Sequence, residues 1–115
     1  MKAEDLEERT AVFAEDARAF VRKLPRTVSN IEDVKQLVRA SGSIAANCIE
    51  ANESLSAKDK LMRFRISRKE AKESGLWLRL VYLDGDAELT RRREQLIQES
   101  RELRSIISAI ITKLE

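Results

Sequence analysis

Apolar residues recur every three or four positions along most of this 115-residue chain. Near the N-terminus they are Leu6, Phe13, Ala17, Phe20 and Leu24, with spacings of 7, 4, 3 and 4. Near the C-terminus a seven-residue repeat joins Leu89, Leu96, Leu103 and Ile110. Such spacing is typical of amphipathic helices, whereas half-buried strands alternate apolar and polar positions. The pattern predicts an all-α protein.

A few helix-breaking residues divide the chain into four segments. They are Pro25, the Ser-Leu-Ser stretch at 54–56 and the turn Asp84-Gly85-Asp86. The expected helices cover residues 4–24, 29–53, 56–84 and 86–115. Four helices of this length with short connections favour one domain over residues 1–115, an up-down-up-down antiparallel four-helix bundle.

Capping residues mark the expected starts of the helices. Ser29 and Glu32 have the spacing of a capping box, which predicts that the second helix begins near Ser29. Ser56 precedes the third helix, and Asp59 in its first turn favours the positive end of the helix dipole.

The apolar stripes predict which side chains meet in the core. These are Phe13, Phe20, Ile44, Cys48, Phe64, Trp77, Leu96, Leu103 and Ile110. Cys48 is the only cysteine, so it has no partner for an internal disulfide. Its apolar neighbours predict a small core residue and not a reactive thiol, which would need a basic and open setting.

The second segment carries two apolar stripes. One contains Val34, Val38, Ser41, Ala45 and Cys48, and the other contains Leu37, Ala40, Ile44, Asn47 and Ala51. Two stripes need two partners, and the small residues around Gly42 allow a close approach of another backbone. We therefore expect this helix to contact more than its own bundle, and the protein to be a homo-oligomer.

Two carboxylates interrupt the apolar face of the third segment. Glu70 and Glu73 share one side of the expected helix with apolar residues, and buried carboxylates need partners. Candidates from the second segment are Arg39 and Asn47, and Arg68 and Lys69 lie nearby in the chain. The simpler alternative is a half-exposed pair between Lys69 and Glu73 at i,i+4.

Composition excludes several catalytic chemistries. The chain has no histidine, which excludes Ser-His-Asp and Cys-His catalysis and histidine-ligated zinc. Glu70 and Glu73 lack the Glu-x-x-His pattern of a di-iron bundle, and there is no glycine-rich phosphate loop. We expect no enzymatic activity, no cofactor and no metal site.

Positive charge is concentrated in the third segment. The net charge of the chain is +2, yet residues 56–84 contain eight basic and four acidic side chains. The basic residues on one helix face are Lys58, Arg65, Lys72 and Arg79, with Arg68 and Lys69 beside them. A basic stripe of this kind indicates contact with a phosphate backbone, and the alternative is an ordinary solvated helix face.

The run Arg91-Arg92-Arg93 is a secondary candidate for nucleic-acid binding. Glu88 and Glu94 lie three or four residues from these arginines, so pairing within the helix accounts for part of the run. Because aromatic residues make up only 4% of the chain, we expect backbone-driven and sequence-tolerant binding.

Neither a membrane span nor a secretion signal is evident. No stretch of 18 apolar residues occurs, and the N-terminus is acidic without an apolar core. We expect a cytoplasmic protein.

The middle of the chain resembles a known family. Residues 36–47 followed by Glu50-Ala51 resemble the "SI..N..EA" motif of the 23S rRNA intervening-sequence protein family, whose members are often called four helix bundle proteins. Residues 56–59, 69–74 and 77–78 resemble the signature that follows it. The resemblance covers about residues 8–110, and Gly75 departs from it where a bulkier residue is usual.

This resemblance implies a ring-shaped homopentamer of four-helix bundles. The accessory variability protein of diversity-generating retroelements looks like a relative, which implies RNA or DNA and a reverse transcriptase as partners. The residues that carry the motif, which we interpret as structural, are Ser43, Asn47, Glu50, Glu70, Glu73 and Trp77. Two functional hypotheses follow: an oligomer that binds nucleic acid through its basic face, or an oligomeric adaptor that docks a protein such as a reverse transcriptase.

Overall fold

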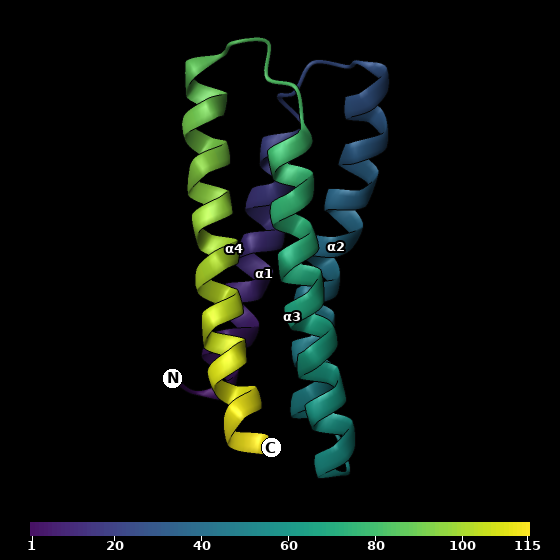
Figure 1. Cartoon of the computed structure of the whole chain (residues 1–115), viewed down its shortest axis with the longest axis vertical. Coiled ribbons are helices and arrows are strands. Elements are labelled where there is room, and N and C mark those ends of the chain that lie inside the picture. Colours follow the sequence, from purple (N-terminus) through teal and green to yellow (C-terminus); the bar gives the residue numbers. More distant parts are fainter.

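Four α-helices make up the protein in a computed structural model that describes all residues 1–115 (Figure 1). They are α1 (Ala3–Val21), α2 (Val28–Asn52), α3 (Ala57–Leu80) and α4 (Ala87–Leu114). The chain contains no strand, so the predicted all-α four-helix architecture is confirmed.

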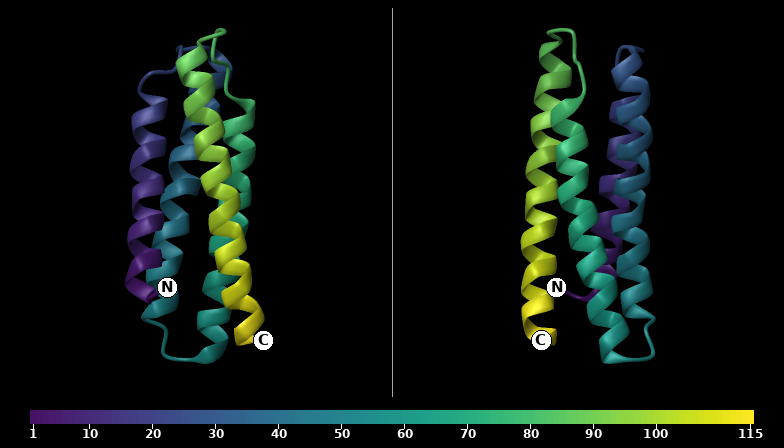
Figure 2. Two further views of the ribbon diagram at one scale, coloured as in Figure 1. Left: turned by 90° about the vertical axis from the view of Figure 1, so that its left-hand side faces the viewer. Right: turned by 45° about the vertical axis from the view of Figure 1, so that its right-hand side comes forward.

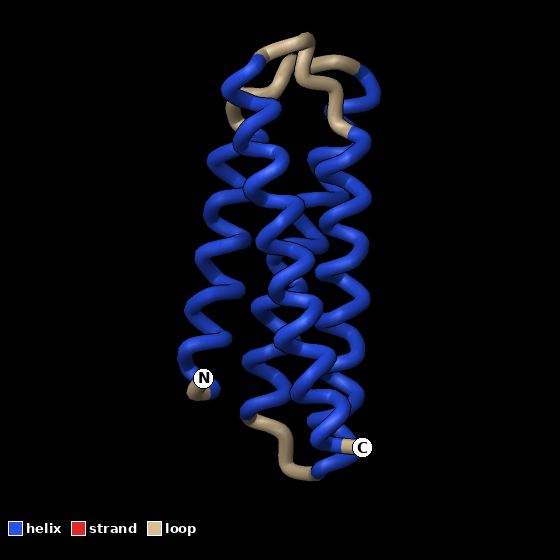
Figure 3. Tube along the Cα trace, turned by 60° about the vertical axis from the view of Figure 1, so that its left-hand side comes forward, coloured by secondary structure: helices blue, strands red, loops and turns tan.

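The helices run alternately up and down in a bundle that measures 46 × 23 × 19 Å. Each helix packs against two neighbours, α2 and α4 flanking both α1 and α3, and the diagonal pairs make no close contact. Figure 2 shows this order from two further sides. The α1–α2 and α3–α4 connections lie at one end, and the α2–α3 connection lies at the other with both termini (Figure 3).

Side-chain caps begin three of the helices. The Ser56 hydroxyl and the Asp86 carboxylate each accept the amide three residues ahead, at 3.1 and 2.9 Å, which agrees with the predicted starts of α3 and α4. The predicted cap at Ser29 is wrong. Thr27 has extended backbone angles and its hydroxyl accepts the Asn30 amide at 3.1 Å, so the cap lies two residues earlier than predicted and α2 begins at Val28.

Helix α3 ends at Leu80 and not at Asp84 as predicted. Val81 and Leu83 leave the helix and are buried at the end of the core. The predicted turn is present at Asp84-Gly85, where both residues have positive φ angles of 53° and 73°. Glycine adopts this left-handed conformation without the steric cost that a side chain adds.

Asn30 joins the two connections at this end of the bundle. Its side-chain nitrogen donates to the carbonyls of Pro25 and Tyr82, both at 2.9 Å, and its oxygen accepts the Tyr82 amide at 2.8 Å. The residue is only 1% exposed. One amide side chain therefore satisfies three backbone groups that no helix can pair.

Seven of the nine predicted core residues are buried, and Trp77 and Ile110 are only partly buried. Ile107 and Ile111 occupy the core in place of Ile110. An ideal helix rotates by about 20° per heptad relative to a strict seven-residue repeat. Over three heptads the stripe that starts at Leu89 therefore turns away from the core before it reaches Ile110.

The two stripes of α2 differ in their burial. The stripe through Leu37 and Ile44 is fully enclosed, whereas Val34, Val38 and Ala45 are half-buried. The close approach expected at Gly42 occurs within the chain: a Cβ at this position would lie 3.3 Å from the guanidinium of Arg18 on α1. The glycine thus accommodates that side chain.

Cys48 is completely buried, as predicted. Its Sγ lies 3.3 Å from the Ser67 hydroxyl, which donates to the Ile44 carbonyl at 2.9 Å. Burial raises the pKa of the Cys48 thiol, which keeps it in the unreactive protonated form.

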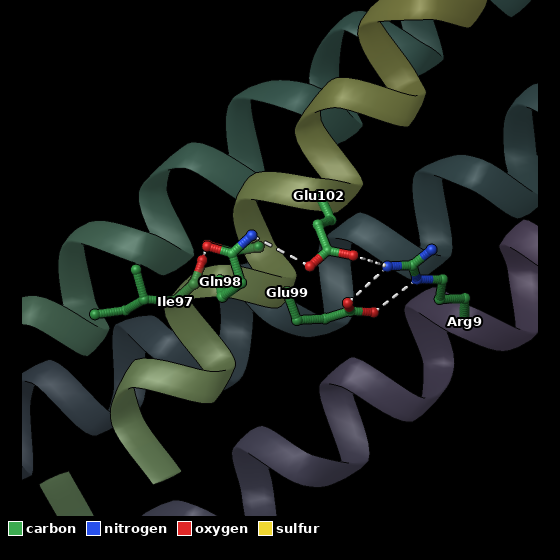
Figure 4. A network of polar contacts seen from close by, with 6 residues as sticks. Arg9, Ile97, Gln98, Glu99 and Glu102 are labelled. Carbon is green, nitrogen blue, oxygen red and sulfur yellow. Dashed lines mark hydrogen bonds and ion pairs between the residues drawn. The ribbon is translucent and has the colours of Figure 1, made fainter. Parts of the chain in front are cut away.

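Helices α1 and α4 are joined by an ion-pair network (Figure 4). Arg9 donates two hydrogen bonds to Glu99, both at 2.8 Å, and a third to Glu102 at 2.9 Å. These carboxylates raise the pKa of Arg9 above its already high value. Hydrogen bonds from Gln98 and from Arg9 lower the pKa of Glu102.

Candidate nucleic-acid interface

The basic stripe lies on one face of α3. Lys58, Arg65, Lys72 and Arg79 are all exposed. At 1.5 Å per residue they extend over about 32 Å of the helix. Lys58 lies in the first turn, and the other three residues border the groove between α3 and α4.

Two adjoining cavities hollow the groove between α3 and α4. The first, which we call the basic basin, has a volume of about 820 Å³ and no apolar or acidic lining residue. Its lining is Arg65, Arg68, Lys69, Lys72, Arg101, Arg104, Ser105 and Ser108. The second, which we call the Leu76–Ile97 cleft, has a volume of about 610 Å³. Lys72, Arg101 and Arg104 line both cavities.

Four cations in the basic basin have no carboxylate within 4.0 Å. They are Arg68, Lys72, Arg101 and Arg104; Arg65 pairs with Glu115 at 2.8 Å, and Lys69 lies 3.8 Å from Glu70. Like charges about 4 Å apart repel each other by roughly 1 kcal/mol in bulk water and roughly 4 kcal/mol near a protein surface. The groove therefore carries positive charge that only a bound anion or salt would neutralise.

The two walls of the groove approach each other closely at Gly75. A Cβ on this residue would lie 3.3 Å from the Ser100 hydroxyl on α4. Two turns from there, the Arg68 guanidinium donates to the Ser108 hydroxyl at 3.4 Å. Gly75, where the sequence departs from its family pattern, thus gives the groove a narrow floor of small side chains.

The run Arg91-Arg92-Arg93 lies outside the groove. Arg91 forms an ion pair with Glu88, lowering the pKa of that carboxyl, and Arg92 donates to the Gln95 side chain at 2.8 Å. Arg93 is partly buried and donates to the Val81 carbonyl at 3.3 Å. Contacts within the chain therefore engage all three arginines.

Comparison with known proteins places the chain in a family. The family model for 23S rRNA-intervening sequence proteins matches residues 5–109. The chain belongs to this family. A solved structure from Bacteroides thetaiotaomicron VPI-5482, described as a protein of unknown function from the S23 ribosomal protein family, matches with a TM-score of 0.80. It is 26% identical, and the match covers 97% of this chain and 99% of that one. Comparison with curated proteins finds no match.

Glu70 and Glu73, two motif residues of this 23S rRNA-intervening sequence family protein, share Arg39 of α2. The Arg39 guanidinium lies 3.3 Å from Glu70 and 3.5 Å from Glu73. The Glu70 side chain is 5% exposed and that of Glu73 is 38% exposed. Arg39 is one of the partners proposed from the sequence. The alternative pair between Lys69 and Glu73 is wrong, because Lys69 lies near Glu70 instead.

The other motif residues have unequal surroundings. Asn47 is buried, donates to the carbonyl and hydroxyl of Ser43 at 2.9 and 3.0 Å, and accepts from Arg63 at 3.4 Å. Trp77 packs half-buried against the core. Glu50 is exposed. Its position in α2 faces outward, so the structural role interpreted for this residue has no basis in the packing of the four helices.

Sequence analysis missed the α4 side of the groove. Arg101, Arg104, Ser105 and Ser108 lie on one face of α4 at helical spacing. The net charge of this segment does not reveal them, because residues 85–115 contain six basic and six acidic side chains. The acidic residues Glu99 and Glu102 turn toward α1, and the arginines turn toward α3.

Two further features bear on ligands and membranes. No group of three or more histidine, cysteine, aspartate or glutamate side chains is arranged to hold a metal ion. None of the four helices combines the length and the apolar character needed to cross a bilayer.

Proposed function

We propose that this family member binds nucleic acid without catalysing a reaction, through the exposed face of α3 and the groove that α3 forms with α4. The observation that carries this proposal is the set of four cations in the basic basin that lack a carboxylate partner. Phosphate contacts need such free donors, and arginine and lysine supply most of them. Arg91, Arg92 and Arg93 have a smaller role because they are already engaged.

We also propose that the protein assembles into a ring-shaped homopentamer. Ring closure needs two different faces that fit each other. Apolar side chains remain exposed on α2 and α3, among them Ile31, Ile49, Met62, Leu76 and Leu80. Residues 1–55 contain eight basic and ten acidic side chains, opposite in balance to α3. A ring would repeat the basic groove, so several subunits could bind one strand with higher avidity. The number of five subunits is taken from the family resemblance alone.

A mobility shift at low salt with labelled RNA and DNA tests nucleic-acid binding. We expect a shift whose affinity falls with salt, with a log–log slope of about −0.9Z on duplex DNA for Z neutralised phosphates. Charge reversal at Arg65 and Lys72 together should flatten this slope and weaken binding to every sequence. The matched control reverses Arg26 and Lys35, which are exposed, line neither cavity of the groove and change the net charge equally.

If the unaltered protein shifts neither RNA nor DNA at low salt, nucleic-acid binding is refuted. The adaptor hypothesis would then replace it, with an acidic surface of a protein such as a reverse transcriptase as the ligand of the groove.

Light scattering coupled to size exclusion tests the ring. A pentamer has about five times the chain mass of 13.2 kDa. A monomer mass that does not change with protein concentration would refute self-association.

A further inference from the structure

The two cavities of the α3–α4 groove have different chemistry although they share a wall. The basic basin is lined only by cations and serine hydroxyls. The Leu76–Ile97 cleft adds two apolar side chains and the carboxylates of Glu73 and Glu94. The cleft also keeps Lys72, Arg101 and Arg104 and adds Arg79, so it remains open to an anionic strand. A ligand that uses every group of both cavities is anionic along the basin and brings an apolar surface with hydrogen-bond donors to the side chains that only the cleft has.

We propose that the groove binds a single strand of nucleic acid, with phosphates in the basic basin and one unstacked guanine base in the Leu76–Ile97 cleft. This inference rests on the nucleic-acid binding proposed above. It adds one position of base recognition to binding that is otherwise driven by the backbone.

The shape of the cleft suits a flat ring. Leu76 on α3 and Ile97 on α4 provide apolar walls, and Leu76 is 44% exposed. Between these walls the small residues Gly75 and Ser100 line the bottom of the cleft and leave room for a ring. A base has two apolar faces and a polar edge. Its faces can pack against Leu76 and Ile97 while its edge points toward the carboxylates.

The carboxylates favour guanine among the bases. Guanine presents two adjacent N–H groups, N1–H and N2–H, that can pair with both oxygens of one carboxylate. Uracil and thymine present one N–H between two carbonyls, which repel a carboxylate. Both carboxylates have a cation nearby: Glu73 lies 3.5 Å from Arg39, and Glu94 lies 3.7 Å from the Arg93 Nε. Glu94 is the better acceptor because its contact is longer and its side chain is 64% exposed, against 38% for Glu73.

The arrangement requires a single strand. In a duplex the base is stacked and its pairing edge is occupied, whereas bases in single-stranded loops can be turned out into a pocket. Arg68 and Gly75 are seven residues apart on α3, about 10 Å along the helix. Adjacent nucleotides of one strand can therefore reach the basin and the cleft together.

Fluorescence anisotropy with the full chain and short labelled RNA strands tests the inference. The strands are a uridine oligomer, the same oligomer with one central guanosine, and the same with one central inosine, which lacks the N2 amino group. We expect the guanosine strand to bind about tenfold more tightly than the other two, and more tightly than its own duplex. GMP should compete only in large excess because it lacks the neighbouring phosphates.

Two variants connect the guanine preference to the cleft. Glu94→Gln should abolish the preference and leave or strengthen the binding of the uridine strand, because it removes one negative charge. Glu88→Gln makes the same charge change on α4 outside both cavities, and should keep the preference.

The outcomes separate the two proposals. Equal binding of all three strands, or an unchanged preference in Glu94→Gln, overturns the guanine site but leaves nucleic-acid binding in place. Failure of every strand to bind at low salt overturns both. Competition by GMP at the concentration of the strand overturns the single-strand ligand and assigns the site to a free nucleotide.

Discussion

Replacing Asn30 by alanine should be among the most destabilising single changes outside the apolar core. The substitution removes three hydrogen bonds, at 2.9, 2.9 and 2.8 Å, from a side chain that is 1% exposed. Each such bond contributes about 1 kcal/mol net, and an unpaired buried partner adds a further penalty. We therefore expect the free energy of unfolding to fall by roughly 2–4 kcal/mol.

Urea denaturation followed by circular dichroism at a fixed protein concentration measures this change. The midpoint should fall while the slope with urea stays the same, because the surface exposed on unfolding does not change. Ser29→Ala is the matched control. Ser29 is exposed in the first turn of α2 and the cap is Thr27, so the control should stay within about 0.5 kcal/mol of the unaltered protein.

Asn30→Asp tests the direction of the hydrogen bonds. The aspartate keeps an oxygen that accepts the Tyr82 amide. It also places a carboxylate oxygen against the carbonyl oxygens of Pro25 and Tyr82, which accept hydrogen bonds from the Asn30 side-chain nitrogen in the unaltered protein. Its folded pKa should rise above the unfolded value of about 3.9. Protonation then favours the folded state, so the deficit relative to the unaltered protein should shrink as the pH falls through that raised pKa. An Asn30→Ala protein as stable as the unaltered one would refute the reasoning.

Three further predictions concern side chains elsewhere in the bundle. Arg9→Met removes three hydrogen bonds to α4, two to Glu99 and one to Glu102, and should lower the unfolding free energy by about 1 kcal/mol at pH 7. The pKa of Glu102 is lowered in the folded protein, so its ion pair with Arg9 stabilises the fold above about pH 4.3, and this stabilisation is lost as the pH falls through the folded pKa. The stability difference between Arg9→Met and the unaltered protein should therefore be smaller in acid, and a difference that grew would contradict this. Cys48 should react with a thiol reagent slowly in buffer and fully in urea, and equal rates would show that the site is open. Glu70→Ala should cost roughly 1–3 kcal/mol and more than Glu73→Ala, measured by thermal unfolding, because Glu70 is the buried partner; the reverse order would point to a role for Glu73 outside the fold.

The proposed interface explains why the protein has a strong local charge and only a small net one. Glu99 and Glu102 of α4 pair with Arg9 on the α1 side, and Arg101 and Arg104 remain without a carboxylate partner on the α3 side. A net charge of +2 would make a lone subunit a poor ligand for nucleic acid. Cations gathered in one groove, and repeated in an oligomer, would give the local field that phosphate binding needs.

The sequence by itself determined the helices and much of the core. Apolar spacing, Pro25 and the Asp84-Gly85 turn are local signals, and Ser56 and Asp86 cap helices through amides three residues ahead. Such signals depend on neighbours in the chain, so they can be interpreted without the fold. A partner for the buried Glu70 carboxylate was also predicted, because an ionised group on an apolar face needs one.

Only the tertiary structure decided which distant residues meet. Arg39 was one of several partners for Glu70 until the packing of α2 against α3 selected it. Asn30 has no local signal, because its partners lie in two different loops. Arg104 joins the basic basin because α4 turns that face toward α3. Helix rotation and lateral packing set these contacts, and both depend on the whole core, which a local sequence pattern does not specify.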